Sequence, residues 1–159
     1  MFKKFVVAYD HRADAKTVER VKLALNEENI ETVVFEDNGE ANDYPVLANK
    51  AYEMFKNLGA DGLLLMCGTG IGMNMVANKF AGIRAVLATS EAEAYFARRH
   101  ENANCLVFGV GYGDGVYEVK LCRRKMVRMI KTFVNAEFEG DRHIRRVEQI
   151  SKLERGERL

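Results

Sequence analysis

Cysteine is scarce in this chain, and the pattern of the three that are present narrows what the protein can be. Cys67, Cys105 and Cys122 are widely spaced, and no C-x-x-C pair occurs. This odd count and spacing argue against a disulfide framework and against a structural zinc site. Free thiols persist in reducing compartments, so the sequence predicts a cytoplasmic protein.

Long apolar runs and an excess of charge of one sign are also missing. No segment approaches the ~20 apolar residues of a membrane-spanning helix, and the first residues, MFKKFVVAYDH, reach Asp10 too soon for a signal peptide. The net charge is +1 and the isoelectric point about 7.7. Neither a membrane nor a nucleic acid is therefore an expected partner, and any positive site must be local.

What the chain does contain is ordinary for a globular protein. Its 159 residues are 48% apolar and 30% charged, enough to bury one proper core. No internal repeat, low-complexity tract or linker divides it. We therefore expect one domain over residues 1–159.

Short apolar runs alternate with helical patterns along most of the chain. Strands are predicted over 3–9, 30–36, 62–67, 82–88 and 103–109, helices over 14–29, 44–59 and from Ser90, and a turn-rich loop over 37–43. Residues 116–138 form a long amphipathic basic stretch, and 139–159 a charged, helical one. Repeated strand–helix–strand order implies a parallel sheet covered by helices on both faces.

In such a sheet, ligands bind beyond the carboxyl ends of the strands. Asp10 and His11 follow the first strand, and Cys67 ends the third. His100 comes near the end of the helix that follows the fourth strand. We expect these side chains to gather on one side of the sheet.

The stretch CGTGIG follows the third strand, with Gly68, Gly70 and Gly72 at alternate positions. It matches neither the G-x-G-x-x-G dinucleotide fingerprint nor a P-loop. Its bare backbone is able to approach a ligand and aim N–H groups at it, as a site for an oxyanion or enediolate requires. A tight strand–helix turn with no ligand is the alternative.

Cys67 immediately precedes this loop. A helix N-terminus lowers a thiol pKa, so a thiolate at this position is a candidate nucleophile or base. A small buried apolar residue is the alternative. Cys105 and Cys122 fall in a predicted strand and helix, where inert packing is expected.

The remaining polar candidates each have a structural alternative. His100 is able to serve as a helix C-terminal cation, Asp10 as a helix N-cap, and His11 as part of a turn. Arg142 and Arg146 lie four residues apart on one helix face, around His143. Two guanidinium groups so placed suit a phosphate, and a solvated charged face is the alternative.

Taken together, these residues resemble the ribose-5-phosphate isomerase B family, which also includes the galactose-6-phosphate isomerase subunits. The resemblance covers most of the chain. It is carried by YDH after the first strand, DYP at 43–45, CGTGIGMNMVANKFAGIRA at 67–85, RRHENAN at 98–104 and EGDRHIRRVEQI at 139–150.

The resemblance implies a Rossmann-like three-layer αβα sandwich with a five-stranded parallel sheet and an extended C-terminal helix. It implies a metal- and cofactor-independent aldose–ketose isomerase of the pentose phosphate pathway, assembled as a homodimer or homotetramer whose active sites are shared between subunits. The substrate would be a small sugar phosphate.

Roles follow by position in the family motifs. Cys67 would be the base, Thr69 and the N–H groups of the three glycines would stabilise the enediolate, and His100 with Asp10 would open the sugar ring. The implied substrate-binding residues are His11, Tyr44, Asn74, Glu101, Arg142, His143 and Arg146.

The chain departs from the family pattern around the sugar and phosphate ends of the implied site. Glu101 stands where many relatives have Asn, VGYGDG lacks an arginine that commonly follows VFG, and DHRADAKT is atypical. These departures keep two alternatives to a ribose 5-phosphate isomerase open. One is an isomerase of a hexose 6-phosphate such as galactose or allose 6-phosphate, and the other is a non-catalytic sugar-phosphate-binding subunit.

Overall fold

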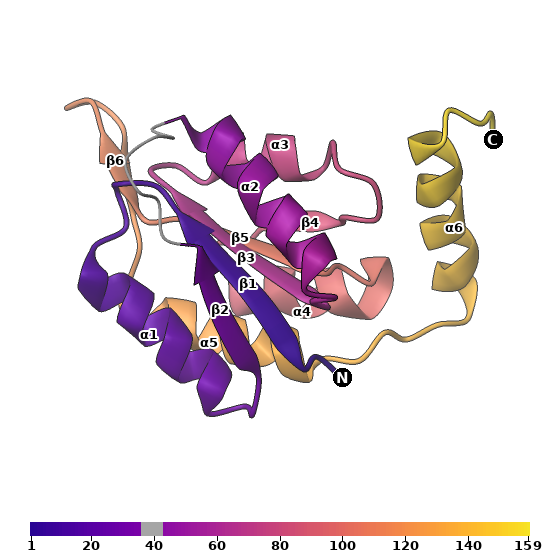
Figure 1. Ribbon diagram of the computed structural model, residues 1–159, viewed down its shortest axis with the longest axis horizontal. Helices are drawn as coiled ribbons and strands as arrows, with labels where there is room; N and C mark the ends of the chain where they lie inside the picture. The colour runs from indigo at the N-terminus through magenta and orange to yellow at the C-terminus, as the bar shows by residue number, and fades with distance from the viewer. Residues whose placement is uncertain (36–42) are drawn as a thin grey trace.

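The computed structural model describes residues 1–35 and 43–159 (Figure 1). Residues 36–42, which hold the end of the second predicted strand and most of the predicted loop, lie outside the described residues. The elements are β1 (Lys4–Tyr9), α1 (Ala15–Asn26), β2 (Glu31–Phe35), α2 (Tyr44–Asn57), β3 (Gly62–Cys67), α3 (Ile71–Ala77), β4 (Ala85–Leu87), α4 (Glu91–Glu101), β5 (Cys105–Gly109), β6 (Gly111–Gly113), β7 (Glu118–Lys120), α5 (Arg123–Asn135) and α6 (Arg142–Glu154).

Five strands form one parallel sheet in the order β2-β1-β3-β5-β4. All six residues of β3 are buried, as expected for a central strand covered on both faces. After β1 the chain adds β2 at one edge of the sheet. From β3 onward it adds its strands on the other side of β1. The switch in direction therefore falls between β1 and β3, where ligands of open α/β sheets bind.

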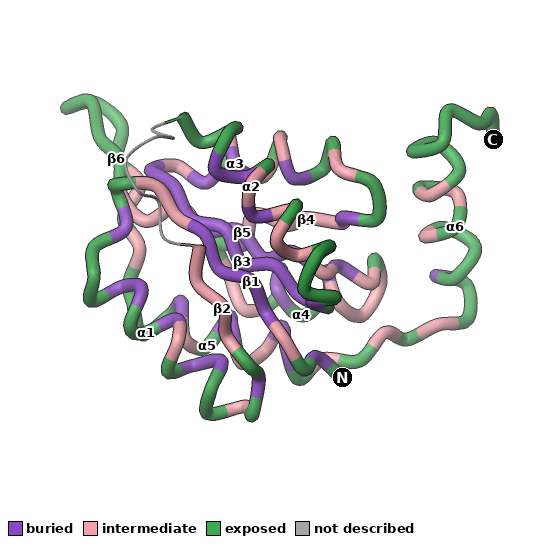
Figure 2. The backbone as a smooth tube through the Cα atoms, in the orientation of Figure 1, coloured by how far each residue is buried: buried purple, intermediate pink, exposed green. Residues whose placement is uncertain are grey.

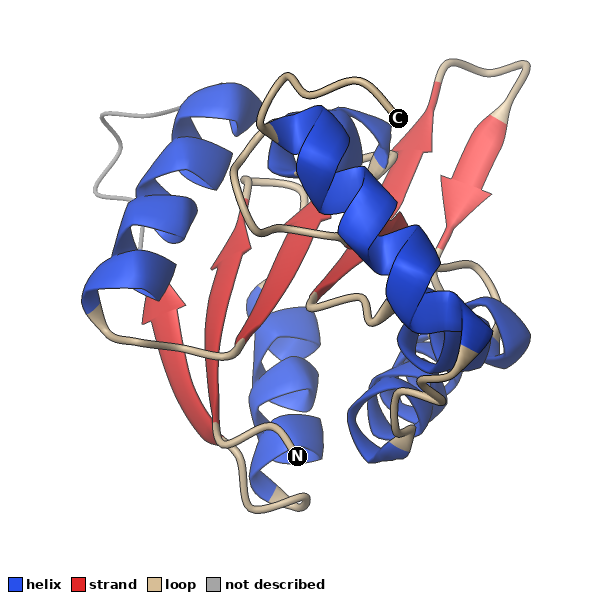
Figure 3. Cartoon of the chain, turned by 90° about the vertical axis from the view of Figure 1, so that its right-hand side faces the viewer, coloured by secondary structure: helices blue, strands red, loops and turns tan. Residues whose placement is uncertain are grey.

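Helices cover both faces of the sheet (Figure 3). Alternate residues of β1 point to opposite faces: Phe5 and Val7 pack with α1, α4 and α5, whereas Val6 and Ala8 pack with α2 and α3. The buried residues follow the strands and the inner helix faces (Figure 2). The predicted three-layer αβα sandwich with a five-stranded parallel sheet is confirmed.

Local signals set the helix starts. Ser90 caps α4 in a full capping box with Glu93, and Pro45 lies in the first turn of α2, both as predicted. The N-cap of α1 is Asp14, whose Oδ1 accepts a 2.8 Å hydrogen bond from the Thr17 N–H. Asp10, the candidate that the sequence offered for this cap, lies at the end of β1 instead.

The basic stretch at 116–138 divides in two. Its first part contributes β7, which pairs antiparallel with β6, and its second part is α5. Cys122 is the N-cap residue of α5 and is exposed, which contradicts the expected inert packing. Only Cys105 is fully buried.

The last helix, α6, stands apart from the sandwich at the end of an extended segment (Figure 1). Its interior-facing contacts are with α4, and the Gly82 N–H donates to Glu154 at 2.8 Å. Among the described residues, no helix combines the length and apolar character needed to span a bilayer.

Candidate active site

A cavity of about 190 Å³ opens at the carboxyl edge of the sheet, at the switch point between β1 and β3. β1 and β3 pair in parallel as far as Tyr9 and Met66, so the residues that follow the two strands lie next to each other. The lining residues are Asp10, Arg12, Tyr44, Cys67, Gly68, Thr69, Gly72 and Tyr112. Six of these eight are candidates from the sequence; Arg12 and Tyr112 are not.

Cys67 is the last residue of β3 and lines the cavity with a side chain that is 5% exposed. Its carbonyl accepts a 3.0 Å hydrogen bond from the Val110 N–H, which fixes the strand end. Cys67 is therefore almost completely buried and borders the cavity.

Burial also raises the pKa of the Cys67 thiol, contrary to the lowering expected from the helix N-terminus. Loss of water disfavours the thiolate more than the surrounding dipoles favour it. Backbone N–H groups of Met73, Gly70 and Thr69 oppose the rise, while the carboxylate of Asp10 adds to it. The backbone N–H groups do lower the Cys67 pKa, as predicted, but desolvation raises it by more.

The three glycines of the loop have different structural surroundings, so each is glycine for a different reason. Gly70 adopts φ +77°, and a Cβ there would lie 2.5 Å from Leu87 Cδ1. A glycine is therefore needed at this position both for the left-handed backbone and for close packing against β4. A Cβ on Gly72 would lie 2.6 Å from the ring of Tyr44. Only Gly68 and Gly72 line the cavity, so the expected close approach of bare backbone to a ligand applies to these two.

Other candidates near the cavity differ in what they contact. The Thr69 hydroxyl accepts a 3.2 Å hydrogen bond from the Ile71 N–H, and Asp10 Oδ1 accepts one of 2.9 Å from the Arg12 N–H. Asn74 follows in α3, and its buried Oδ1 has no hydrogen-bond partner among the described residues. His11 is exposed and does not line the cavity.

His100 lies at the opposite edge of the sheet from Cys67, which corrects the expectation that both share one side. Just beyond α4, the Asn104 carbonyl accepts from the Leu63 N–H at the start of β3, and the Asn104 N–H donates to the Arg84 carbonyl before β4. A crossover helix runs antiparallel to its strands. The residue that ends it therefore returns to their amino ends.

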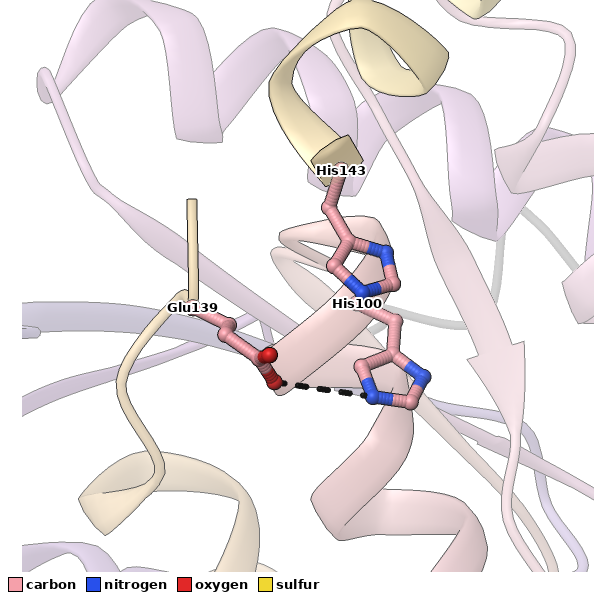
Figure 4. Close-up of side chains that lie close together, drawn as sticks. All are labelled: His100, Glu139 and His143. Carbon is pink, nitrogen blue, oxygen red and sulfur yellow. Dashed lines mark ion pairs between the residues drawn. The ribbon is translucent and has the colours of Figure 1, made fainter. Parts of the chain in front are cut away.

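There His100 belongs to a second cluster of polar side chains (Figure 4). Its ring stacks on that of His143, with centroids 4.3 Å apart and planes 7° from parallel. Glu139 Oε2 lies 3.8 Å from His100 Nε2 and 3.1 Å from Arg99 Nη2. Arg142 Nε donates to His143 Nε2 at 3.4 Å, so α6 brings its basic residues to this cluster.

His143 is buried in this cluster, and its Nδ1 has no hydrogen-bond partner among the described residues. Desolvation lowers the pKa of His143, and the neighbouring His100, Arg142 and Arg146 lower it further. This imidazole is therefore neutral at pH 7.

The donor atoms of His100, Glu139 and His143 lie within 4.8 Å of one another, but they do not form a convincing metal centre. The lone pairs of imidazole nitrogens lie in the ring planes, and stacked parallel rings cannot aim them at one ion. The Glu139 carboxylate is held by Arg99, and the pKa of Glu139 is lowered by that hydrogen bond. A cation would have to displace an arginine.

A larger cavity of about 780 Å³ lies beside this cluster, between α4 and α6. His100 and Glu101 border it, together with the apolar side chains of Phe96, Ile150 and Leu153. Within one chain, the sequence-predicted site residues thus fall into two groups. One surrounds Cys67 and the other His100.

Arg12, Tyr112 and Glu139 belong to these two groups and were missed as candidates. Arg12 had a sequence signal, since it directly follows Asp10 and His11 at the end of a strand. Glu139 is the first residue of the motif EGDRHIRRVEQI, in which only basic residues were named as candidates. Tyr112 had no signal, because its place depends on the β6–β7 pairing.

Fold and cavity together define a doubly wound α/β protein with a cavity at the sheet's switch point. Residues 5–150 match the family model described as Ribose/Galactose Isomerase. The chain therefore belongs to the ribose/galactose isomerase family.

Individual relatives agree. The chain is 38% identical over 117 residues to ribose-5-phosphate isomerase B of Escherichia coli K12, covering 74% of this chain and 73% of that protein. It is 33% identical over 153 residues to the putative sugar phosphate isomerase YwlF of Bacillus subtilis, covering 95% and 97%. The structure of ribose-5-phosphate isomerase B from Mycoplasma genitalium with bound ribulose-5-phosphate superimposes with a TM-score of 0.82 at 30% identity, covering 98% of both chains.

Proposed function

We propose that this protein interconverts ribose 5-phosphate and ribulose 5-phosphate through an enediolate, with Cys67 as the base. The observation that carries the proposal is a strand-end thiol that faces the cavity beside a glycine loop, in a member of a sugar isomerase family. Residues 1–159 act as one isomerase domain, in the cytoplasm, where the three free thiols remain reduced.

The reaction moves one proton between neighbouring carbons. The Cys67 thiolate takes the proton from C2 of the open-chain aldose, and the electron pair of the broken C–H bond forms the C1–C2 double bond of the enediolate. The π pair of the C1 carbonyl moves onto O1, and O1 takes up the proton that the C2 hydroxyl gives up. The resulting thiol then returns its proton to C1, and an electron pair on O2 forms the ketone at C2. Proton transfer of this kind needs a base in direct reach of the carbon-bound hydrogen.

The enediolate carries negative charge on oxygen, and donors for it must be in place beforehand. We assign this role to the Thr69 hydroxyl and to the backbone N–H groups of Gly68, Gly70 and Gly72. The Gly70 amide, which opposes the rise in the thiol pKa, would then also help to hold the oxyanion. Tyr44 and Asn74 would line the sugar.

His100 with Asp10 would open the sugar ring, and His11, Arg142 and Arg146 would hold the phosphate, with His143 and Glu101 nearby. Because His100 and Cys67 belong to opposite edges of one sheet, a single chain does not unite them. We therefore propose a homodimer or homotetramer in which the His100 cluster of one subunit completes the Cys67 cavity of another.

Exposed apolar side chains support this assembly. They lie on α3, α4 and α6, the elements around the two groups of residues: Ile71, Met75, Phe96, Ile150 and Leu153 are between 42% and 62% exposed. An apolar surface of this kind on a folded chain is typical of a protein interface.

The first test is a substrate panel of ribose 5-phosphate, allose 6-phosphate and galactose 6-phosphate, assayed with wild type and Cys67→Ala. We expect ribose 5-phosphate to be the best substrate and Cys67→Ala to lose about 10²- to 10⁴-fold in turnover. The matched control is Cys122→Ala, which removes an exposed thiol outside the cavity. Unchanged turnover in Cys67→Ala would eliminate the proposed base.

The same panel decides between the alternatives. Glu101, a carboxylate beside the ring-opening histidine, favours contact with an additional sugar hydroxyl, and a preference for a hexose 6-phosphate would identify the chain as a hexose-phosphate isomerase. Sugar-phosphate binding without solvent deuterium incorporation at C2 would identify a non-catalytic subunit. Activity retained in a strong chelator is expected for a metal-independent enzyme.

Shared sites predict complementation between inactive variants. In a mixed dimer of Cys67→Ala and His100→Ala, one site carries both substitutions and the other carries neither. Random reassociation makes half of all dimers mixed, so about a quarter of wild-type activity should return. No recovery after verified subunit exchange would contradict sites built from two chains.

A further inference from the structure

We propose that Arg12 binds the phosphate group of the substrate, from the same subunit that supplies Cys67. This inference rests on the proposed function for the identity of the sugar phosphate, while the binding of an oxyanion by Arg12 is argued from the cavity itself. Four observations support it.

The main chain of Arg12 is fixed at the carboxyl end of β1. Its N–H donates to Asp10 Oδ1 at 2.9 Å, and the Ala13 N–H donates to the Asp10 carbonyl at 3.1 Å. Asp10 in turn is tied to β3, since its N–H donates to the Met66 carbonyl at 3.0 Å. Arg12 therefore starts from a rigid turn beside the strand that ends in Cys67.

Arg12 is exposed, and its guanidinium lies over an aromatic ring. The Arg12 guanidinium carbon is 5.5 Å from the centroid of Tyr112, within the range of a cation–π contact. Tyr112 is the middle residue of β6, paired with Val119. The Gly111 N–H donates to the Gly68 carbonyl at 3.0 Å, so the hairpin is joined to the glycine loop.

Two segments that depart from the family pattern therefore meet at this cavity. DHRADAKT supplies Arg12, and VGYGDG supplies Tyr112 as the surface that orients it. Stacking on a ring leaves the edge of a guanidinium free for hydrogen bonds, and that edge matches two oxygens of a phosphate.

The charged side chains of the cavity leave the Arg12 guanidinium available to an anion. Arg12 is the one cationic side chain among its lining residues, and Asp10 is the one carboxylate. Within residues 1–35 and 43–159, the Arg12 guanidinium forms no ion pair, whereas Arg123 is bound to Asp14 and Arg128 to Glu91. A dianion at Arg12 would remain near the exposed mouth of the cavity while the sugar carbons reach Cys67.

The test compares Arg12→Met with Arg124→Met, an exposed arginine of α5 that lines a different groove. We expect Arg12→Met to raise the KM for ribose 5-phosphate, and the inhibition constant of inorganic phosphate, by about 10- to 100-fold, the loss of one charged hydrogen-bonded pair. Turnover at saturation should change less than about threefold. Arg12→Lys should recover part of the loss, and Arg124→Met should match wild type.

Binding of inorganic phosphate, followed by titration calorimetry, separates this inference from the proposed function. If wild type turns over no sugar phosphate but Arg12→Met still loses phosphate affinity relative to Arg124→Met, the isomerase proposal fails and the anion site stands. If Arg12→Met binds phosphate as wild type does, or if both variants lose affinity equally, the inference about Arg12 is overturned.

Subunit mixing tests which chain supplies the arginine. Arg12→Met mixed with His100→Ala should regenerate wild-type sites in the mixed dimers, with a wild-type KM. Arg12→Met mixed with Cys67→Ala should regenerate none, because both residues belong to one subunit's half of the site. The opposite pattern would assign Arg12 to the other half-site and overturn the arrangement proposed here.

Discussion

At the scale of single residues, the three cysteines show how position decides thiol chemistry. Burial raises the pKa of Cys67 despite three nearby amides, and burial alone raises the pKa of Cys105 much further. Cys122 is exposed at the start of α5, where backbone N–H groups of Lys125 and Arg124 lower its pKa. One residue type therefore appears in three electrostatic environments within one chain.

These environments predict an order of alkylation by iodoacetamide. Cys122 should react first, Cys67 more slowly, and Cys105 only after unfolding, because the thiolate is the reacting species and must be accessible. Below its pKa, a thiol gains about tenfold in thiolate per pH unit, so the Cys67 rate should climb through pH 8 without a plateau. Peptide mass spectrometry of the labelled protein measures each rate. A plateau for Cys67 below pH 7 would mean that the dipoles outweigh burial.

At the scale of elements, the turn after β3 depends on a glycine for steric reasons. At Gly70, φ is +77°, and an added Cβ would lie 2.7 Å from the Gly109 backbone nitrogen. Gly82 has the same φ with nothing within 4 Å. Comparing Gly82 with Gly70 therefore separates the cost of a left-handed backbone from the cost of steric crowding.

We therefore expect Gly82→Ala to lower the free energy of unfolding by about 1–2 kcal/mol, the cost of a left-handed alanine. Gly70→Ala should lose that amount plus about 1–3 kcal/mol for overpacking against β4 and β5. Urea unfolding of the two variants gives the difference. Equal losses would show that the neighbouring strands yield without cost.

The capping box of α4 offers a second prediction at this scale. The Ser90 hydroxyl accepts from the Glu93 N–H at 3.2 Å, and Glu93 Oε2 accepts from the Ser90 N–H at 3.0 Å. Ser90→Ala should lower the free energy of unfolding by about 1 kcal/mol, while Ser90→Gly should cost only a few tenths. Thermal and urea unfolding would measure both, and a neutral Ser90→Ala would show that water replaces the cap.

The sequence predicted most elements correctly because their signals are local. Apolar periodicity, a proline in the first turn and an N-capping serine each act within a few residues. The β6–β7 hairpin was missed because its strands are only three residues long and two of the three residues of β6 are glycine. They are held by pairing with each other and by the glycine loop, which no local pattern reports.

At the scale of the whole molecule, α6 is an element that one chain leaves largely uncovered (Figure 1). It stands off the sandwich and carries Ile150 and Leu153, which are 42% and 57% exposed. In the proposed assembly, this exposed apolar surface would face a second subunit. Burying this surface would remove an apolar area that is costly to leave in water.

We predict that Leu153→Glu weakens self-association and lowers activity together, because a charge at an apolar interface must be desolvated. Lys152→Gln, one residue earlier on an exposed side chain, is the control and should retain both. Analytical ultracentrifugation over a dilution series, paired with the isomerase assay, measures the link. A monomeric Leu153→Glu with full activity would contradict shared active sites.

The candidate site was partly predictable from sequence. Asp10, Tyr44, Cys67, Gly68, Thr69 and Gly72 do line one cavity, because strand ends in a parallel sheet share an edge. His100 could have been assigned to the other edge from sequence, since a crossover helix must return to the amino ends of the strands. Their catalytic roles stay predictions.

Residue types at short, fixed spacings were enough to predict the family, the strand–helix alternation and the thiol beside the glycine loop. The burial that raises the Cys67 pKa, the distance between His100 and Cys67, and the contact of Arg12 with Tyr112 became visible only in the folded chain. Desolvation and contacts between distant segments depend on how the whole chain packs, and no spacing along the sequence specifies them.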